Sequence, residues 1–354
     1  MPSTLIKAVG HYVPENVVTN NDLVQHMDTT DEWITQRTGI KERRFFTEGK
    51  DTVSSMGANA ARMALERAGV NASEIEMIVF ATLSPDYNFP GSGVLLQREL
   101  GLPGIPCIDV RAQCSGFIYG LSIADQYIKT GAYKTILLVG SEIQSNVMEI
   151  SDRGRGMAVI FGDGAGAAVL QATTEEGRGV LSTHIHADGV YAEKLTVQHP
   201  GSNRKARVTK EMIEDGSMLP YMDGPFVFKN AVVRFPEVIN EALTHNNLTK
   251  DDIDLLIPHQ ANLRISQAVQ EKFGLSDDKV FNNIQKYGNT TAASIPLALS
   301  EAWQEGRVKP GNLICSGSFW SRIYVGFGTG ALVVGATLAV FDTNYTLESF
   351  SVTS

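Results

Sequence analysis

A chain of 354 residues with 43% hydrophobic and 19% charged side chains is long enough for about two domains of an ordinary globular protein. The formal net charge of −9 argues against a general nucleic-acid binder. Cys107, Cys114 and Cys315 are spaced too irregularly for a disulfide framework or a zinc site, so we expect no bound metal and a reducing, cytoplasmic location. The longest apolar stretch, 331–341, is well short of the roughly 20 residues of a membrane helix, and the N-terminus does not read as a signal peptide, so no membrane partner is expected.

Helical patterns alternate with short β-rich runs along the chain. A first helix is predicted over 52–68, with Asp51 as its candidate N-cap and Gly69 as its stop, and a later helix over 231–244. The polar segment 191–223 reads as a surface excursion between two more apolar parts. This alternation predicts an α/β fold.

A weak internal repeat divides the chain into two similar halves. Three pairs of segments are similar in sequence: 70–82 with 248–260, 135–141 with 312–318, and 161–169 with 327–334. Because each half is then an α/β unit, we expect the two units to stack as a layered sandwich. The predicted divisions are 1–175 for the first half, 176–225 for a connecting excursion and 226–354 for the second half.

Cys114 is a candidate nucleophile, because a short apolar run ends there and a helical pattern begins. The apolar residues that follow recur at helical spacing, at Phe117, Leu121, Ala124 and Ile128. The helix dipole and the free amides of Ser115 and Gly116 should then stabilise a thiolate and lower the pKa of the cysteine. The alternative is a small buried hydrophobe, which is what most free cysteines are.

Two further polar residues stand at comparable places in the second half. His259 follows an apolar run that gives way at Pro258, and Asn289 opens another predicted helix. Polar side chains at strand ends and helix starts point into the crevice where open α/β sheets bind ligands. Aligning Gly131 with Gly306 superimposes Cys114 on Asn289, so two equivalent helix starts should face each other across a pseudo-twofold axis.

A Cys, a His and an Asn in this order on a duplicated chain resemble the thiolase superfamily. The sequence is more similar still to the β-ketoacyl-[acyl carrier protein] synthase III family. The matching phrases extend over nearly the whole chain and lie at 31–40, 108–120, 152–153, 161–168, 258–264 and 288–290. The resemblance implies a thiolase-like αβαβα sandwich of duplicated α/β units.

The same resemblance implies a decarboxylating Claisen condensation that initiates fatty acid synthesis. Cys114 would take the acyl group of an acyl-CoA, and malonyl-[acyl carrier protein] would then lose carbon dioxide and attack the thioester. His259 and Asn289 would act as neutral donors to the enolate oxygen, so no strong base is needed. The family implies a homodimer and no tightly bound cofactor, with acyl-CoA as a substrate. Cys315 lies in a predicted buried strand and reads as structural.

The resemblance also assigns residues to the two substrates. Trp33, Arg37 and Arg153 match positions that hold the adenine and phosphates of CoA, and an indole face with guanidinium groups suits that nucleotide. Asn262 resembles a pantetheine contact. The alternative for Trp33 is a core aromatic on a helix face.

Three further residues resemble positions at the carrier protein and the acyl pocket. Arg264 resembles the basic residue that receives the acidic carrier protein, with a solvated helix cation as the alternative. Phe89 matches a residue that crosses the dimer interface into the partner's acyl pocket, and Phe228 resembles another pocket wall.

The chain departs from the family pattern near its C-terminus. The segment Ser318–Tyr324 is inserted before the Gly-rich turn 326–330, aliphatic residues 331–334 replace an aromatic stretch, and a tail follows from 342 to 354. The Gly-rich turn of the family supplies an oxyanion-hole amide, so catalytic efficiency and acyl-chain length are left open.

Two other functions remain compatible with the three polar residues. One is an enzyme of secondary metabolism that uses the same triad on other acyl-CoA substrates. The other is a Cys-His-Asn hydrolase, because His259 follows Cys114 by 145 residues, within the spacing of papain-like enzymes. A stable acyl adduct on Cys114 would separate a condensing enzyme from a hydrolase.

Overall fold

The structure, a computed structural model, describes residues 2–175, 177–318 and 331–340, and for 331–336 the backbone alone. The inserted residues after Ser318 and the tail therefore lie outside the described residues. No helix among the described residues is long and apolar enough to cross a membrane. In the same part of the chain, no group of three or more His, Cys, Asp or Glu side chains could hold a metal ion.

Two sheets organise the molecule. The first has the strand order β1 (Ser3–Tyr12), β7 (Gly164–Thr173), β6 (Thr135–Glu142), β4 (Met77–Ala81), β5 (Cys107–Val110). The second has the order β8 (Gly179–Gly189), β13 (Ala331–Val340), β12 (Leu313–Ser318), β11 (Leu255–Pro258). The strand directions around one central strand are the same in the two sheets. In the first sheet, β6 runs parallel to β4 and antiparallel to β7. In the second, β12 runs parallel to β11 and antiparallel to β13.

The predicted repeat is visible in this order. Strands β4, β6 and β7 occupy the three aligned segments of the first half, and β11, β12 and β13 occupy those of the second. A parallel bridge between Leu256 and Val280 stands where β5 pairs with β4 in the first half. Strand β8 lies within the predicted connection 176–225, so the second sheet begins earlier in the chain than position 226.

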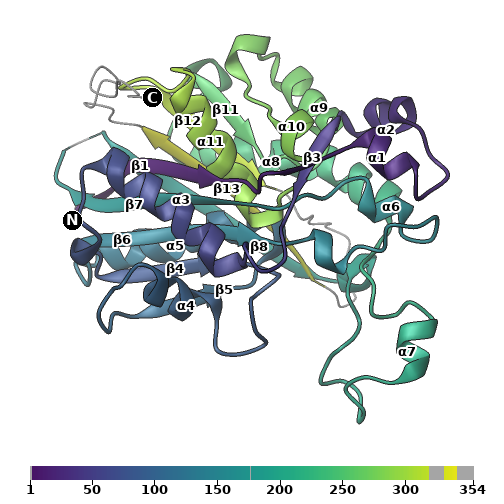
Figure 1. Cartoon of the computed structure of the whole chain (residues 1–354). Helices are drawn as coiled ribbons and strands as arrows, with labels where there is room; N and C mark the ends of the chain where they lie inside the picture. The colour runs from purple at the N-terminus through teal and green to yellow at the C-terminus, as the bar shows by residue number, and fades with distance from the viewer. Residues whose placement is uncertain (1, 176, 319–330, 341–354) are drawn as a thin grey trace, which may run out of the picture.

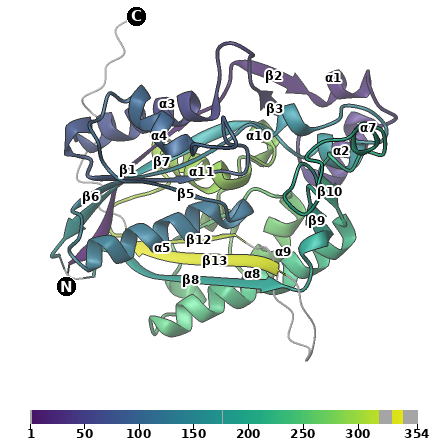
Figure 2. The same ribbon diagram turned by 90° about the horizontal axis from the view of Figure 1, so that it is seen from below.

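Layers of helices alternate with the two sheets, as Figures 1 and 2 show, so that the molecule has five layers. The outer layers are α3 (Val53–Ala68) and α4 (Ser92–Glu99) on the first sheet, and α8 (Gly224–His245) and α9 (Leu263–Phe273) on the second. The central layer holds α5 (Gly116–Lys129) and α11 (Ser294–Gln304). The predicted layered α/β sandwich is therefore confirmed.

The largest buried cluster lies around the central helices. The predicted apolar face of α5 is buried there, with Phe117, Leu121, Ala124 and Ile128 at most 2% exposed. Residues of both sheets contribute to the same cluster, among them Ile6 of β1 and Ile257 of β11. Burying such side chains stabilises the fold by about 1.5–3 kcal/mol each, so the two halves share one core.

Two helix starts differ from their predicted positions. Helix α3 is capped by Thr52, whose side chain accepts from the Ser55 amide, whereas Asp51 accepts a 2.9 Å hydrogen bond from the Tyr12 hydroxyl. Gly69 ends α3 in the left-handed conformation, as predicted. Helix α8 begins at Gly224 rather than near 231, because the Asp223 carboxylate caps it.

Short elements surround the open end of the central layer. They are β2 (Asn16–Thr19), α1 (Asn20–Val24), α2 (Asp31–Thr38), β3 (Glu42–Phe45), α6 (Arg155–Ala158), β9 (Leu195–Thr196), α7 (Lys210–Glu214), β10 (Tyr221–Met222) and α10 (Ile284–Tyr287). Residues of α2, α6, β9 and β10 reach the cavity described next.

Candidate active site

Cys114 lies in a 3₁₀ turn, Gln113–Ser115, between β5 and the start of α5. Only 5% of the residue is exposed. The left-handed conformation of Gln113, with φ of 47°, turns the chain sharply there. The sequence therefore places the thiol at the helix start, as predicted.

The predicted lowering of the Cys114 pKa is wrong. The amide of Ser115 donates to the Ala112 carbonyl at 3.1 Å, and the amide of Gly116 donates to the Gln113 carbonyl, so neither is free to stabilise a thiolate. Burial raises the pKa of Cys114 to about 12, and the nearby carboxylate of Glu142 acts in the same direction. The thiol is neutral at pH 7 in the free chain.

His259 follows β11 directly, and its backbone amide donates to the Gly317 carbonyl of β12 at 2.7 Å. Its Nδ1 is hydrogen-bonded to the Ser294 hydroxyl, and its Nε2 is buried with no partner among the described residues. Burial lowers the pKa of His259 to about 3, so the imidazole is neutral at physiological pH. This state suits the predicted neutral donor.

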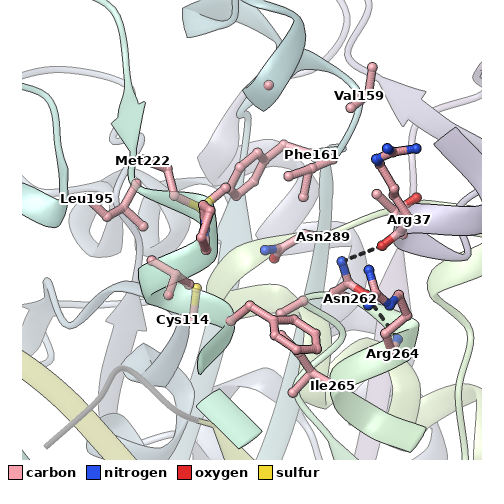
Figure 3. Close-up of a pocket in the computed structure, with 18 of the residues that line it drawn as sticks. Arg37, Cys114, Val159, Phe161, Leu195, Met222, Asn262, Arg264, Ile265 and Asn289 are labelled. Atoms are coloured by element: carbon pink, nitrogen blue, oxygen red, sulfur yellow. Dashed lines mark hydrogen bonds between the residues drawn. The ribbon is translucent and has the colours of Figure 1, made fainter. Parts of the chain in front are cut away.

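Asn289 is held by both its backbone and its side chain. Its amide donates to the Ile160 carbonyl at 2.9 Å, and its Oδ1 accepts from the Thr291 amide at 2.9 Å. Because Oδ1 is occupied, the NH₂ group is the part of the side chain left for the cavity that Cys114 lines (Figure 3).

The predicted equivalence of Cys114 and Asn289 is wrong by three residues. Helix α11 begins at Ser294 after the 3₁₀ turn Thr291–Ala293, so Ala292 is the counterpart of Cys114. Aligning the helix ends at Gly131 and Gly306 misplaced the starts, because α5 has 14 residues and α11 has 11. Asn289 precedes the turn instead of opening the helix.

A cavity of about 470 Å³ brings the three candidate catalytic residues together. Five other predicted site residues line it with Cys114, His259 and Asn289: Trp33, Arg37, Phe228, Asn262 and Arg264. They come from both halves of the chain, and Figure 3 shows how several of them converge. The described residues that line this cavity do not include Arg153 or Phe89.

The side of the cavity formed by α2 is aromatic and basic, with Trp33 and Arg37 in its lining. The guanidinium of Arg37 lies 4.4 Å from the ring centre of Trp33, and that of Arg155 lies 5.6 Å from the same ring. Arg153 instead forms a 2.7 Å ion pair with Glu149. Arg155, which sequence reasoning did not single out, therefore lies closer to Trp33 than its position two residues after Arg153 suggested.

Asn262 and Arg264 form the part of the cavity wall next to α2. Asn262 caps α9 and its Nδ2 donates to the Arg37 carbonyl at 2.9 Å, which ties α9 to α2. Arg264 is exposed, and its guanidinium lies 5.1 Å from the ring centre of Phe228. Phe228 therefore lines the cavity on the Arg264 side.

A second cavity of about 1100 Å³ also reaches Cys114. Phe89 lies on its wall and is 84% exposed. Apolar side chains such as Val147, Met157 and Leu195 contribute to the lining. The cysteine thus stands where two cavities meet, and the two predicted acyl-pocket residues, Phe89 and Phe228, belong to different ones.

Two family models match the chain. One, described as 3-oxoacyl-[acyl-carrier-protein (ACP)] synthase III, matches residues 108–189, and one described as the C terminal of the same synthase matches residues 243–340. The beta-ketoacyl-[acyl-carrier-protein] synthase III of Escherichia coli strain K12 is 45% identical over 331 residues, covering 94% of this chain and 99% of the relative.

Solved structures agree over nearly the whole chain. The 3-oxoacyl-[acyl-carrier-protein] synthase III of Aquifex aeolicus VF5 is 40% identical with a TM-score of 0.84, covering 96% of this chain and 100% of that one. The priming beta-ketosynthase from the R1128 polyketide biosynthetic pathway is 32% identical with a TM-score of 0.83, covering 96% of each chain.

Proposed function

The chain belongs to the β-ketoacyl-[acyl carrier protein] synthase III family, and from that premise we propose how its site performs the reaction. Family membership confirms the predicted thiolase-like fold and the predicted acyltransferase that initiates fatty acid synthesis. The hydrolase alternative is therefore set aside. The observation that carries the proposal is the convergence of Cys114, His259 and Asn289 on one cavity.

In the first half-reaction, Cys114 Sγ attacks the thioester carbonyl of an acyl-CoA. A new bond forms between Sγ and the acyl carbon, the bond to the CoA sulfur breaks, and the thiol proton of Cys114 ends on CoA. Because the Cys114 thiol is neutral at pH 7, proton loss accompanies the attack rather than preceding it.

In the second half-reaction, a malonyl thioester enters the same cavity and loses carbon dioxide. The electron pair of the broken bond moves into an enolate, whose oxygen accepts from His259 Nε2–H and the Asn289 NH₂ group. The enolate carbon then attacks the acyl-Cys114 carbonyl and expels the thiolate, which takes up one proton from solvent. Fixed donors of this kind stabilise charge that develops only during the reaction.

The nucleotide end of CoA would lie on Trp33, with Arg37 and Arg155 supplying positive charge to the phosphates. We propose Arg155 rather than Arg153 for this role, because the guanidinium of Arg155 lies 5.6 Å from the ring centre of Trp33, whereas Arg153 is paired with Glu149. Asn262, on the cavity wall, is our proposed contact for the pantetheine arm.

The malonyl donor is proposed to arrive on the acyl carrier protein. Arg264 is exposed beside the cavity and would receive an acidic partner locally, although the whole chain carries a net charge of −9. Incubation with malonyl-[acyl carrier protein] or malonyl-CoA after acylation distinguishes the two donors. We expect the carrier-bound donor to be used faster, and Arg264→Glu to lower only that rate.

We propose a homodimer in which Phe89 reaches the partner's acyl pocket. An aromatic ring that is 84% exposed favours an interface, because exposed apolar surface is removed from water there. A cytoplasmic location remains our proposal, since the Cys114 nucleophile must stay reduced. Sedimentation at micromolar concentration should give a dimer, and a monomer would contradict the proposal.

The experiment that tests the function is mass spectrometry of the intact protein after incubation with acyl-CoA substrates. We expect a stable acyl adduct on Cys114 that disappears when malonyl-[acyl carrier protein] is added, with a β-ketoacyl product formed. Product from primers of secondary metabolism alone would favour the second candidate, a priming ketosynthase like that of the R1128 pathway.

A further inference from the structure

We propose that Ser294 is a positioning residue that holds His259 in the tautomer with the hydrogen on Nε2. The inference deepens the proposed function and rests on it for the role of His259 in decarboxylation. Ser294 is the first residue of the central helix α11 and is 2% exposed.

The contacts of the serine hydroxyl fix its direction. Ser294 Oγ is hydrogen-bonded to His259 Nδ1, and it accepts from the backbone amide of Gln260 at 3.4 Å. An N–H group can only donate, so Oγ is the acceptor in the contact with Gln260. The single hydrogen of the hydroxyl is therefore free to point at the imidazole.

Two arrangements of hydrogens are conceivable for the buried pair. If the hydroxyl donates to Nδ1, the amide of Gln260, the hydroxyl and Nδ1 are all satisfied. If instead Nδ1–H donated to Oγ, the oxygen would accept twice, and its own hydrogen would have no acceptor among the described residues. A buried polar hydrogen without a partner is destabilising, so the first arrangement is favoured.

The favoured arrangement places the remaining ring hydrogen on Nε2. That atom is buried, has no partner among the described residues, and belongs to a residue that lines the cavity with Cys114 and Asn289. A neutral imidazole with Nε2–H can donate to an enolate oxygen, whereas the opposite tautomer would present a lone pair to it. Ser294 thus decides whether His259 attracts or repels the developing charge.

The main readout is the tautomer of His259 in the unmodified protein. Nitrogen-15 NMR of protein with labelled histidine distinguishes a protonated ring nitrogen from an unprotonated one, and His259→Ala assigns the signal. We expect protonation on Nε2 alone between pH 6 and 8. Protonation on Nδ1 would overturn the proposal, and this measurement needs neither a Ser294 variant nor catalytic activity.

The second readout separates the two half-reactions. We expect Ser294→Ala to lower malonyl decarboxylation about 10- to 100-fold, below the loss for removing a donor outright, while acylation of Cys114 stays unchanged. Ser294→Thr, which keeps a hydroxyl, should restore most of the rate and the Nε2–H signal.

Ser266 provides the matched control. It is also buried, and its hydroxyl donates to Asn282 Oδ1 at 2.6 Å, but it is not among the residues that line the two cavities described. Ser266→Ala should keep the parental decarboxylation rate. If Ser294→Ala kept that rate and the Nε2–H signal too, Ser294 would not position His259. Failure of Cys114 acylation in the parent would instead count against the proposed function and leave the tautomer result standing.

Discussion

Gln113 and Thr291 share a left-handed backbone conformation, with φ of 47° and 50°, at equivalent places in the two halves. Each is the first residue of the 3₁₀ turn that leads into a central helix. Such conformations cost on the order of 1–3 kcal/mol and persist where surrounding structure enforces them. Here one turn carries Cys114, and the other directs the Thr291 amide at Asn289. Each half therefore contributes one strained turn that positions a residue of the site.

Cys114→Ser should lose the acyl adduct and the condensation, because a neutral alcohol is a far weaker nucleophile than a thiol at neutral pH. Intact-mass spectrometry after incubation with acyl-CoA measures this directly. Cys315→Ser is the matched control, because Cys315 is also a buried free cysteine but lies within β12. That control should keep the adduct, and an adduct on the Cys114→Ser protein would contradict the assignment.

His259→Ala and Asn289→Ala should each lower malonyl decarboxylation by about 10²–10³, because each removes a fixed donor to the enolate oxygen. Acylation of Cys114 should continue in both variants, so it serves as an internal control for folding. Carbon dioxide release from a labelled malonyl thioester measures the effect. Parental rates of release in both variants would show that the donors act elsewhere.

The sequence predicted the positions of these residues better than their environments. The alternation of patterns and the repeat were sufficient for the layered α/β sandwich, and the placement of Cys114 before a helix and of His259 after a strand followed from the local patterns. The pKa of Cys114 did not follow, because it depends mainly on how completely the thiol is buried. Burial of the thiol results from the packing of both halves, which a local sequence pattern does not show.

The proposed nucleotide site shows a second limit of the same kind. Arg153 is exposed and Arg155 is half-buried, and both stand in one short segment. Which of them faces Trp33 depends on the turn that leads into α6 and on the competing ion pair with Glu149. A motif match alone cannot decide between positions that differ by two residues.

The reactivity of Cys114 should rise steeply with pH in the free protein. With the pKa raised to about 12, the thiolate fraction grows about tenfold for each pH unit between pH 6 and 9. Alkylation by iodoacetamide, followed on the Cys114 peptide by mass spectrometry, should therefore show no plateau in this range. The Cys315 peptide is the internal reference. A plateau near pH 7 would mean that the dipole of α5 outweighs burial.

Glu142 should make the protein less stable as the pH rises from about 4.5 to about 7. Burial raises the pKa of this carboxyl from 4.5 to about 7, so the folded chain holds a proton that the unfolded chain releases in this window. The stabilisation is complete below the unfolded value and is lost as the pH rises through the folded one. The total is at most about 3 kcal/mol.

Urea unfolding at pH 5 and pH 7 measures that difference. Glu142→Gln is neutral at both values, so its free energy of unfolding should change less between them than that of the parent. Equal changes in the two proteins would assign the pH dependence to other groups, such as Asp163, whose pKa burial also raises.

The primer pocket should accept acyl chains longer than acetyl. The second cavity has a volume of about 1100 Å³, reaches Cys114 and is lined in part by Val147, Met157 and Leu195. Each methylene buried there contributes about 0.8 kcal/mol, so kcat/KM should rise several-fold for each two-carbon step until the cavity is filled. A series from acetyl-CoA to decanoyl-CoA, read as the rate of Cys114 acylation, measures the length.

A narrowed pocket provides the control for that series. Met157→Phe adds bulk to the cavity wall, so it should lower the rate with octanoyl-CoA while leaving the rate with acetyl-CoA nearly unchanged. The inserted segment after Ser318 lies outside the described residues. If octanoyl-CoA gives no Cys114 adduct in the parent protein while acetyl-CoA does, the cavity is closed to primers in solution and the enzyme is specific for short chains.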